Sequence, residues 1–354
     1  MPRPTVDLAT LRPERVCLIK PSSLGDVVHA LPVLSALRAT WPKAHLAWVV
    51  NRGLRGLLDG HPHLDELIPF DRGSVGLGPR GVSAFLRFAT ELRRKRFDLA
   101  IDLQGLFRSG LMTAATGARV RVGLASAREG ATHFYTHRVP TTSATHAVDK
   151  LMEVARAFGG DPRPSFAPSI SAEDRAWAAG VLRGVASPRL IVNVGARWLT
   201  KRWPPAQFAE VAALAARDRG AGLVAVGAPE DAALVADLIE RLGAIPILDL
   251  AGRTNLSQLA AVMEAADCVL SNDTGPLHLA AATGVPDVGV YTCTSPAKTG
   301  PYGPNARVVA SRIWCAGSCV KRCDRMECMD ELSSDRVWSA VRDQIDRGRA
   351  RRAS

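Results

Sequence analysis

The sequence predicts an α/β protein made of two Rossmann-like halves, and three observations carry that prediction. A strand, a glycine-containing loop, a helix and a second strand follow one another over residues 16–50. A second unit of this kind begins with the apolar run 190–194. A third apolar run, 268–270, leads through a glycine-containing turn into a helix-forming stretch. Short apolar runs that end in such loops are typical of buried strands in parallel sheets.

The length of 354 residues allows two domains, each large enough for a core of its own. The segment 159–164 is rich in glycine and proline and has the composition of a hinge. We therefore expect one domain over residues 1–165, a second over 166–332, and a C-terminal helix with a basic tail over 333–354. Residues 349–354 are expected to be disordered.

The net charge of +11 favours anionic partners such as nucleotides or acidic lipids. Nucleic acid is disfavoured, because the basic residues are dispersed, only three tyrosines are available for stacking, and no zinc-finger or RNA-binding motif is present. No run of about 18 uncharged apolar residues predicts a membrane span, and the N-terminus lacks the apolar core of a signal peptide. The protein is therefore expected to be cytoplasmic.

The first strand, 16–19, ends in a loop that runs from Lys20 to Asp26, and a helix is expected from residue 27 to residue 40. A carboxylate at this end of a strand points into the crevice where open α/β sheets bind ligands. Asp26 is therefore a candidate ligand-facing carboxylate, although capping the helix would also explain it. The G-x-G-x-x-G run at 76–81 follows no strand end, and we interpret it as a connector rather than a dinucleotide site.

Two further strand ends carry polar residues. The strand 97–103 leads into Gln104–Ser109, where Arg108 could contact a carboxylate or phosphate. The strand 268–270 leads into Asn272–Pro276, where Thr274 can cap the next helix and Pro276 suits its first turn. The free N–H groups of such a helix start form an anion site, whereas an ordinary capped turn is the alternative.

These stretches resemble one family. The run S-N-D-T-G-P-L-H-L-A-A-A-T-G-V-P at 271–286 resembles the signature of the ADP-heptose:lipopolysaccharide heptosyltransferases, glycosyltransferase family 9. The run K-P-S-S-L-G-D-V-V-H-A-L-P at 20–32 is most similar to the N-terminal motif of heptosyltransferase I, and 102–106 resembles the family's D-x-Q-G-L segment. The resemblance covers almost the whole chain.

The resemblance implies a GT-B fold, in which two Rossmann-like domains face each other across a cleft. It further implies an inverting, metal-independent glycosyltransferase without a cofactor. The first domain would bind a lipid-linked, Kdo-containing acceptor, and the second would bind the donor, ADP-L-glycero-β-D-manno-heptose. Asp26 would be the catalytic base. The implied acceptor-binding residues are Ser22, Ser23, Gln104 and Arg108, and the implied donor-binding residues are Lys201, Asp231, Thr254, Asp273, Thr274, Gly275 and His278.

Lys201 would offset charge on the departing diphosphate, Asp273 would bind sugar hydroxyls, and Asp231 or Glu230 would bind the ribose. The loop before Lys201 departs from the heptosyltransferase I pattern, since Ala196 and Arg197 replace hydroxyl residues. Three alternatives stay open: a GT-B enzyme that uses another nucleotide sugar, a sugar-nucleotide epimerase, and a non-catalytic sugar-nucleotide-binding protein.

Four of the seven cysteines cluster near the C-terminus with spacings of three, three and four intervening residues: Cys315, Cys319, Cys323 and Cys328. Zinc sites usually contain closer pairs, so a metal site is the lesser alternative here. Disulfides are disfavoured in the cytoplasm. Similar cysteine-bearing tails occur in some members of the family, and these members are closer to heptosyltransferase II than to I. The tail and the N-terminal motif therefore indicate different subtypes.

A lipid-linked acceptor implies peripheral contact with the anionic inner face of the inner membrane. The densest basic run supplies a candidate surface beside the acceptor cleft, made of Arg87, Arg93, Arg94, Lys95 and Arg96. A solvated helix end that complements the helix dipole is the alternative interpretation of this run.

Overall fold

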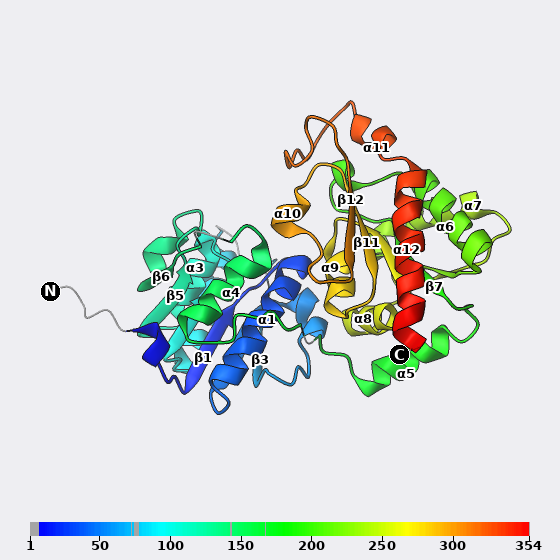
Figure 1. Cartoon of the computed structure of the whole chain (residues 1–354). Helices are drawn as coiled ribbons and strands as arrows, with labels where there is room; N and C mark the ends of the chain where they lie inside the picture. The colour runs from blue at the N-terminus through cyan, green and yellow to red at the C-terminus, as the bar shows by residue number, and fades with distance from the viewer. Residues whose placement is uncertain (1–6, 72, 74–77, 142–143, 167, 354) are drawn as a thin grey trace. The chain divides into compact units, whose positions relative to one another are not determined.

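The computed structural model describes residues 7–71, 73, 78–141, 144–166 and 168–353, and the chain divides into two compact units, Met1–Ser169 and Ile170–Ser354 (Figure 1). The division falls four residues beyond the boundary expected after residue 165. Gly76 and Leu77 of the G-x-G-x-x-G run lie outside the described residues.

The first unit is a six-stranded, all-parallel sheet in the order β3-β2-β1-β4-β5-β6. Helices α1 and α4 pack together. Leu92 of α2 and Met112 of α3 share a core with Cys17 and Ile19 of β1. Its elements are β1 (Arg15–Ile19), α1 (Leu24–Thr40), β2 (His45–Asn51), β3 (Glu66–Phe70), α2 (Pro79–Arg94), β4 (Leu99–Asp102), α3 (Phe107–Ala115), β5 (Val120–Leu124), β6 (His137–Val139) and α4 (Ala147–Ala157).

The second unit repeats this architecture with the order β12-β11-β10-β7-β8-β9, again all parallel. Its elements are α5 (Ala172–Val181), β7 (Arg189–Asn193), α6 (Pro205–Arg219), β8 (Gly222–Val226), α7 (Ala232–Leu242), β9 (Ile247–Asp249), α8 (Leu256–Glu264), β10 (Cys268–Asn272), α9 (Gly275–Ala282), β11 (Asp287–Tyr291), α10 (Pro296–Thr299), β12 (Ala306–Ala310), α11 (Glu327–Glu331) and α12 (Ser334–Ala353).

Both sheets have the strand order of the Rossmann fold, so each has a point where the order reverses: between β1 and β4, and between β7 and β10. Ligands of open α/β sheets bind beside the carboxyl ends of the strands at that point. The prediction of two Rossmann-like halves is confirmed, and each half offers one such position.

Helix α1 begins at Leu24, three residues before the expected start at residue 27. Ser23 is its N-cap, and the Asp26 carboxylate reaches back to the backbone N–H of Ser23, which forms a capping box. Asp26 is therefore in the first turn of the helix and not ahead of it.

Helix α12 runs from Ser334 to Ala353, so the expectation of a disordered tail was wrong for residues 349–353; Ser354 lies outside the described residues. Val337, Val341 and Ile345 are fully buried in the core of the second unit. Arg352 holds the last turn by an ion pair of 2.7 Å to Asp267, which is itself buried. The ion pair of Arg352 and the hydrogen bond of Arg351 to the Ala266 carbonyl at 3.2 Å therefore hold the end of this helix against the second unit.

Within the described ranges, the structure contains no helix with the length and apolar character needed to span a bilayer.

Candidate active site

The loops that follow β1 and β4 bring the predicted acceptor residues to one edge of the first sheet. Ile19 and Asp102 are register partners at the carboxyl ends of these adjacent strands. The backbone N–H of Ser22 donates to Gln104 Oε1 at 3.4 Å, which links the two loops directly. Arg108 is exposed in the first turn of α3. Ser22, Ser23, Gln104, Arg108 and Asp26 thus all lie at the carboxyl edge beside the reversal of strand order.

Asp26 is a half-exposed carboxylate that is held by its neighbours. Its Oδ2 accepts hydrogen bonds from the Ser23 N–H at 2.9 Å and the Ser23 hydroxyl at 2.6 Å. Its Oδ1 lies 3.8 Å from Lys20 Nζ. Burial raises the pKa of Asp26, but Lys20 and the two Ser23 bonds outweigh burial, so the net pKa is lowered. The group is therefore ionised near neutral pH, as a base must be.

Lys20 is a site residue that the sequence interpretation left without a role. Its side chain is buried, and Nζ donates to the Leu103 carbonyl at 2.9 Å. Burial lowers the pKa of Lys20, although the carboxylates of Asp26 and Asp102 oppose the shift. A buried cation next to the proposed base fixes the charge state of that base. The sequence feature that could have identified Lys20 is its position at the end of the first strand, in the same loop as Asp26.

Asp102 is the second residue that was missed, although it begins the D-x-Q-G-L segment. This buried carboxylate accepts from the Tyr135 hydroxyl at 2.7 Å and the Ser109 hydroxyl at 2.8 Å. It also accepts from the backbone N–H groups of Gln104 and Gly105 at 2.8 and 2.9 Å. Four donors on one buried carboxylate fix the loop that carries Gln104.

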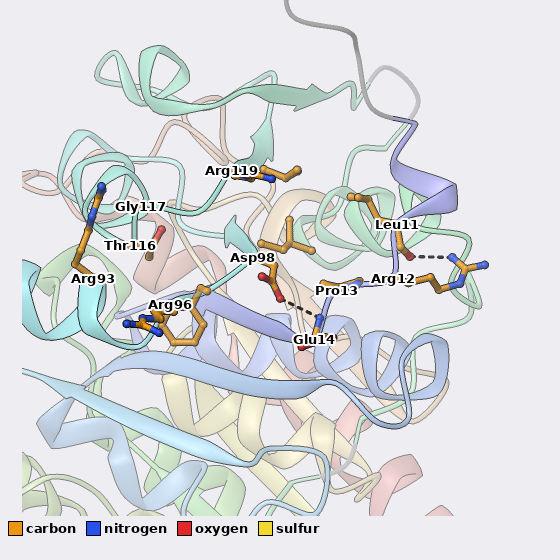
Figure 2. A pocket seen from close by; sticks show the side chains of 13 residues that line it. Leu11, Arg12, Pro13, Glu14, Arg93, Arg96, Asp98, Thr116, Gly117 and Arg119 are labelled. Carbon is orange, nitrogen blue, oxygen red and sulfur yellow. Dashed lines mark hydrogen bonds between the residues drawn. The ribbon is translucent and has the colours of Figure 1, made fainter.

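The basic run Arg93–Arg96 does not lie beside this edge, so its expected position was wrong. Helix α2 ends at Arg94, and β4 begins at Leu99, which puts the run at the amino edge of the sheet. Arg93, Arg96 and Arg119 line a cavity there of about 710 Å³, and their guanidinium groups point in different directions (Figure 2). Lys95 is engaged by Glu66. The geometry favours the alternative of a solvated helix end.

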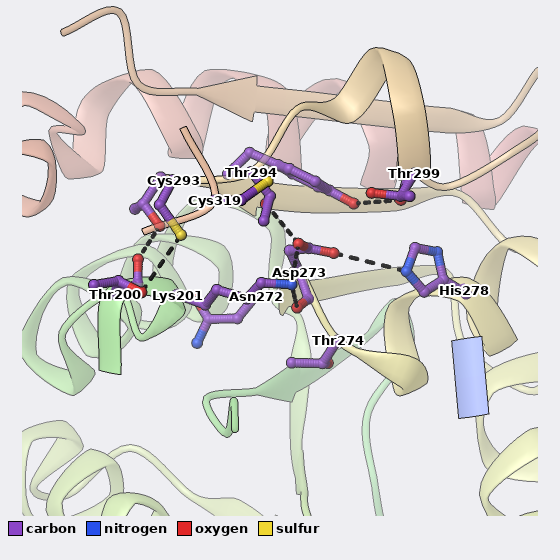
Figure 3. Close-up of polar contacts among 12 residues, drawn as sticks. Thr200, Lys201, Asn272, Asp273, Thr274, His278, Cys293, Thr294, Thr299 and Cys319 are labelled. Atoms are coloured by element: carbon purple, nitrogen blue, oxygen red, sulfur yellow. Dashed lines mark hydrogen bonds and ion pairs between the residues drawn. The ribbon is translucent and has the colours of Figure 1, made fainter. Parts of the chain in front are cut away.

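In the second unit, Asp273 is the centre of a buried polar network (Figure 3). Its Oδ2 lies 2.5 Å from Lys201 Nζ and accepts from the Thr294 hydroxyl at 2.6 Å, while its Oδ1 lies 3.7 Å from His278 Nε2. Burial raises the pKa of Asp273, but His278 and Lys201 outweigh burial, and the net pKa falls well below the usual range of a carboxyl. Both oxygens of the Asp273 carboxylate therefore already have partners within the protein, although this carboxylate was expected to bind sugar hydroxyls.

Thr274 stands at the N-cap position of α9, but its hydroxyl does not cap the helix, contrary to the sequence expectation. The hydroxyl instead accepts a hydrogen bond from Asn193 Nδ2 at 3.0 Å, because Asn193 ends the adjacent strand β7. The first turn of α9, which begins at Gly275, is thus left without a side-chain cap. This is the arrangement that an anion at a helix start requires.

The loops after β7 and β8 also meet. The Asp231 carboxylate accepts from the Ala228 N–H at 3.0 Å and lies so close to Gly195 that a Cβ there would overlap it. Gly252, in the loop after β9 that leads to Thr254, donates to the Gly227 carbonyl at 2.9 Å. Asp231 and Thr254 therefore lie in neighbouring loops at the same carboxyl edge as Lys201 and Asp273.

The four clustered cysteines do not form a ligand set. All are free thiols; Cys328 is buried, Cys315 is half-buried, and Cys319 and Cys323 are exposed. Among the described residues, no group of three or more His, Cys, Asp or Glu side chains is placed to hold a metal ion. Burial and the neighbouring thiols raise the pKa of Cys328 to about 11, so it is a protonated thiol.

Comparison with known proteins identifies the relatives of this chain. The profile of Glycosyltransferase family 9 (heptosyltransferase) matches residues 85–329. Lipopolysaccharide heptosyltransferase 1 of Pseudomonas aeruginosa is 32% identical over 319 residues, which cover 87% of each chain. The chain resembles the glycosyl transferase family 9 structure from Veillonella parvula with a TM-score of 0.81 at 25% identity, covering 96% of this chain and 98% of that one.

A second solved structure, E. coli heptosyltransferase WaaC with ADP-2-deoxy-2-fluoro heptose, gives a TM-score of 0.71 at 26% identity and covers 93% of this chain and 99% of that one. The two Rossmann-like units are those of the GT-B fold. On the strength of the profile match and of a relative above 30% identity along most of both lengths, the chain belongs to glycosyltransferase family 9, the heptosyltransferases.

Proposed function

We propose that this enzyme transfers a heptose from ADP-heptose to a lipopolysaccharide inner-core acceptor, with inversion at the anomeric carbon. One observation carries the proposal: each sheet places a different chemical function at its reversal point. The first sheet places the Asp26 carboxylate there, and the second places the Lys201 ammonium and the uncapped start of α9. Family membership supports both substrate classes. The ADP-2-deoxy-2-fluoro heptose bound by E. coli WaaC supports the donor class, and the name of the Pseudomonas aeruginosa relative, a lipopolysaccharide heptosyltransferase, supports the acceptor class.

In the proposed reaction, Asp26 takes the proton of the acceptor hydroxyl as that oxygen attacks the anomeric carbon. The bond from the anomeric carbon to the donor phosphate breaks in the same displacement, and ADP leaves with one additional negative charge. Lys201 and the N–H groups at Gly275 face that charge. Asp273 holds Lys201 in place, a role that its buried ion pair supports better than contact with sugar hydroxyls.

The other predicted residues keep their roles in the proposal, except that His278 changes from a donor contact to a support of Asp273. Ser22, Ser23, Gln104 and Arg108 contact the acceptor. Asp231 and Thr254 contact the nucleoside, and His278 supports Asp273. The N-terminal motif and the 32% identity to a heptosyltransferase 1 favour the enzyme that adds the first heptose.

The direct test incubates the full chain with ADP-heptose and a Kdo-lipid A acceptor, and follows ADP release together with the mass of the acceptor. We expect an acceptor-dependent gain of one heptose and no comparable transfer from UDP- or GDP-sugars. Preference for another donor would identify a different GT-B enzyme. ADP-heptose binding without any product would identify a binding protein.

We also propose that the protein acts in the cytoplasm, at the inner face of the inner membrane, through the first unit. The sequence of this unit, residues 1–169, contains 23 Lys and Arg against 14 Asp and Glu, a net charge of +9 out of the +11 of the chain. Each basic residue near an anionic leaflet contributes about 1 kcal/mol. Three exposed arginines, Arg52, Arg108 and Arg128, follow strands and so lie at the carboxyl edge, where the acceptor is proposed to bind.

Co-sedimentation with anionic vesicles tests this surface. Changing Arg52, Arg108 and Arg128 to Gln should weaken binding, and binding should fall as salt rises. The matched triple change of Arg93, Arg94 and Arg96 removes the same charge from the amino edge. An equal loss from both triple variants would indicate attraction by overall charge without a preferred face.

A further inference from the structure

Trp198 is flanked by two lysines that come from distant parts of the second unit. Lys201 Nζ lies 4.8 Å from the centroid of its indole ring, and Lys321 Nζ lies 5.0 Å from the same centroid. The sum of these distances, about 10 Å, is the largest separation that the two ammonium groups can have. Two cations therefore converge on one aromatic side chain in the loop that follows β7.

The backbone on either side of Lys321 is held against this loop. The Thr200 hydroxyl donates to the Val320 carbonyl at 2.8 Å, and the Cys319 N–H donates to the Cys293 carbonyl at 2.7 Å. Cys293 Sγ in turn lies 3.5 Å from the Thr200 hydroxyl, and Figure 3 shows Cys319 beside Cys293. These contacts dock the segment 315–328, here called the cysteine segment, beside Lys201.

The two lysines differ in what balances their charge. Lys201 is paired with the buried carboxylate of Asp273 at 2.5 Å. Lys321 is exposed, and within the described part of the chain it makes neither an ion pair nor a hydrogen bond. The group of Lys201, Asp273 and Lys321 therefore carries one uncompensated positive charge. An anion that reaches Lys201 from the solvent meets this second cation as well.

We infer that Lys321 is a second cation for the diphosphate of the donor, and that the cysteine segment serves to deliver it. This inference rests on the proposed function, because it names a further residue of the same donor site. A nucleoside diphosphate leaving group gains one negative charge when the glycosidic bond breaks. An unpaired ammonium group next to Lys201 stabilises that charge without having to give up an existing ion pair.

The test compares ADP and adenosine binding to the full chain by titration calorimetry. Lys321→Met should weaken ADP binding about fivefold to 20-fold and leave adenosine binding unchanged, because adenosine has no phosphate. Lys321→Arg should restore most of the ADP affinity. Arg322→Met is the matched control: it removes one positive charge from the neighbouring exposed residue and should change ADP affinity less than twofold.

Two results would overturn the inference: an ADP affinity of Lys321→Met within twofold of wild type, or an equal loss in Arg322→Met. Either result leaves the proposed function standing, provided that the wild-type chain binds ADP and transfers heptose. If the wild-type chain does not bind ADP, the proposed function fails together with the inference. A loss of adenosine binding in Lys321→Met would point to collapse of the loop and also count against a role in phosphate binding.

Discussion

The ammonium group of Lys201 lies 2.5 Å from the carboxylate of Asp273, and the two side chains are only 19% and 4% exposed. A pair so shielded from solvent differs from a surface salt bridge, because removal of either partner leaves a charge in a poorly hydrated site. His278 and Lys201 together hold the pKa of Asp273 below its usual range, so their stabilising effect on the carboxylate is present above about pH 4 and is lost as pH falls further.

Lys201→Met should therefore reduce both stability and donor affinity. We expect a loss of about 3–5 kcal/mol in the free energy of unfolding and weaker ADP binding. In this variant His278 still opposes the effect of burial on Asp273 but Lys201 no longer does, so the pKa of Asp273 should be higher than in the wild type, and the destabilisation relative to wild type should be larger at pH 8 than at pH 5. Urea denaturation at both pH values checks this. Lys298→Met, at an exposed lysine of α10, is the control and should change little.

Asp26→Asn should separate catalysis from helix capping. The amide oxygen of asparagine can still accept the hydrogen bonds from Ser23, so the melting temperature should change little. Without a base, turnover should fall about 10²–10⁴-fold, with ADP affinity unchanged. Turnover within a few-fold of wild type would reduce Asp26 to a structural cap.

Lys20→Met should change the pH dependence of the reaction. Lys20 is the cation that counters the effect of burial on Asp26, so its loss raises the pKa of that carboxyl. Asp26 must be ionised to act as a base, and the acid limb of kcat/KM should therefore move to higher pH. Lys43→Met, at an exposed lysine of the same unit, is the control. An unmoved acid limb would show that Lys20 does not tune Asp26.

Asp287→Asn should stabilise the protein at alkaline pH. Asp287 is fully buried at the start of β11, and neither carboxyl oxygen has a hydrogen-bond partner among the described residues. Burial raises its pKa far above the ordinary value, so wild-type stability falls as pH rises above about 4. The variant should gain about 1–3 kcal/mol at pH 8 and less at pH 5. Thermal melts of Asp324→Asn, at an exposed position, give the comparison.

The sequence by itself determined the architecture and the chemical inventory of the site. Apolar runs, glycine-containing turns and helix starts are local signals, and they located β1, β4, β7 and β10 together with the loops that follow them. The position of Arg93–Arg96 could also have been inferred, because the run directly precedes a strand and so must lie at the amino edge of the sheet. The residues of the family motifs gave the candidate base and the candidate donor groups.

Only the tertiary structure decided which of these groups pair. The order β1-β4 and β7-β10 joins loops that are about 80 residues apart in sequence, and this brings Lys20 to Leu103 and Asn193 to Thr274. The same packing turns Asp273 toward Lys201, removes the expected cap of α9, and places Lys321 over Trp198. Local propensity cannot specify such contacts, because they depend on strand order and on the burial of charges between elements. Strand order and the burial of these charges are set only when the sheets form.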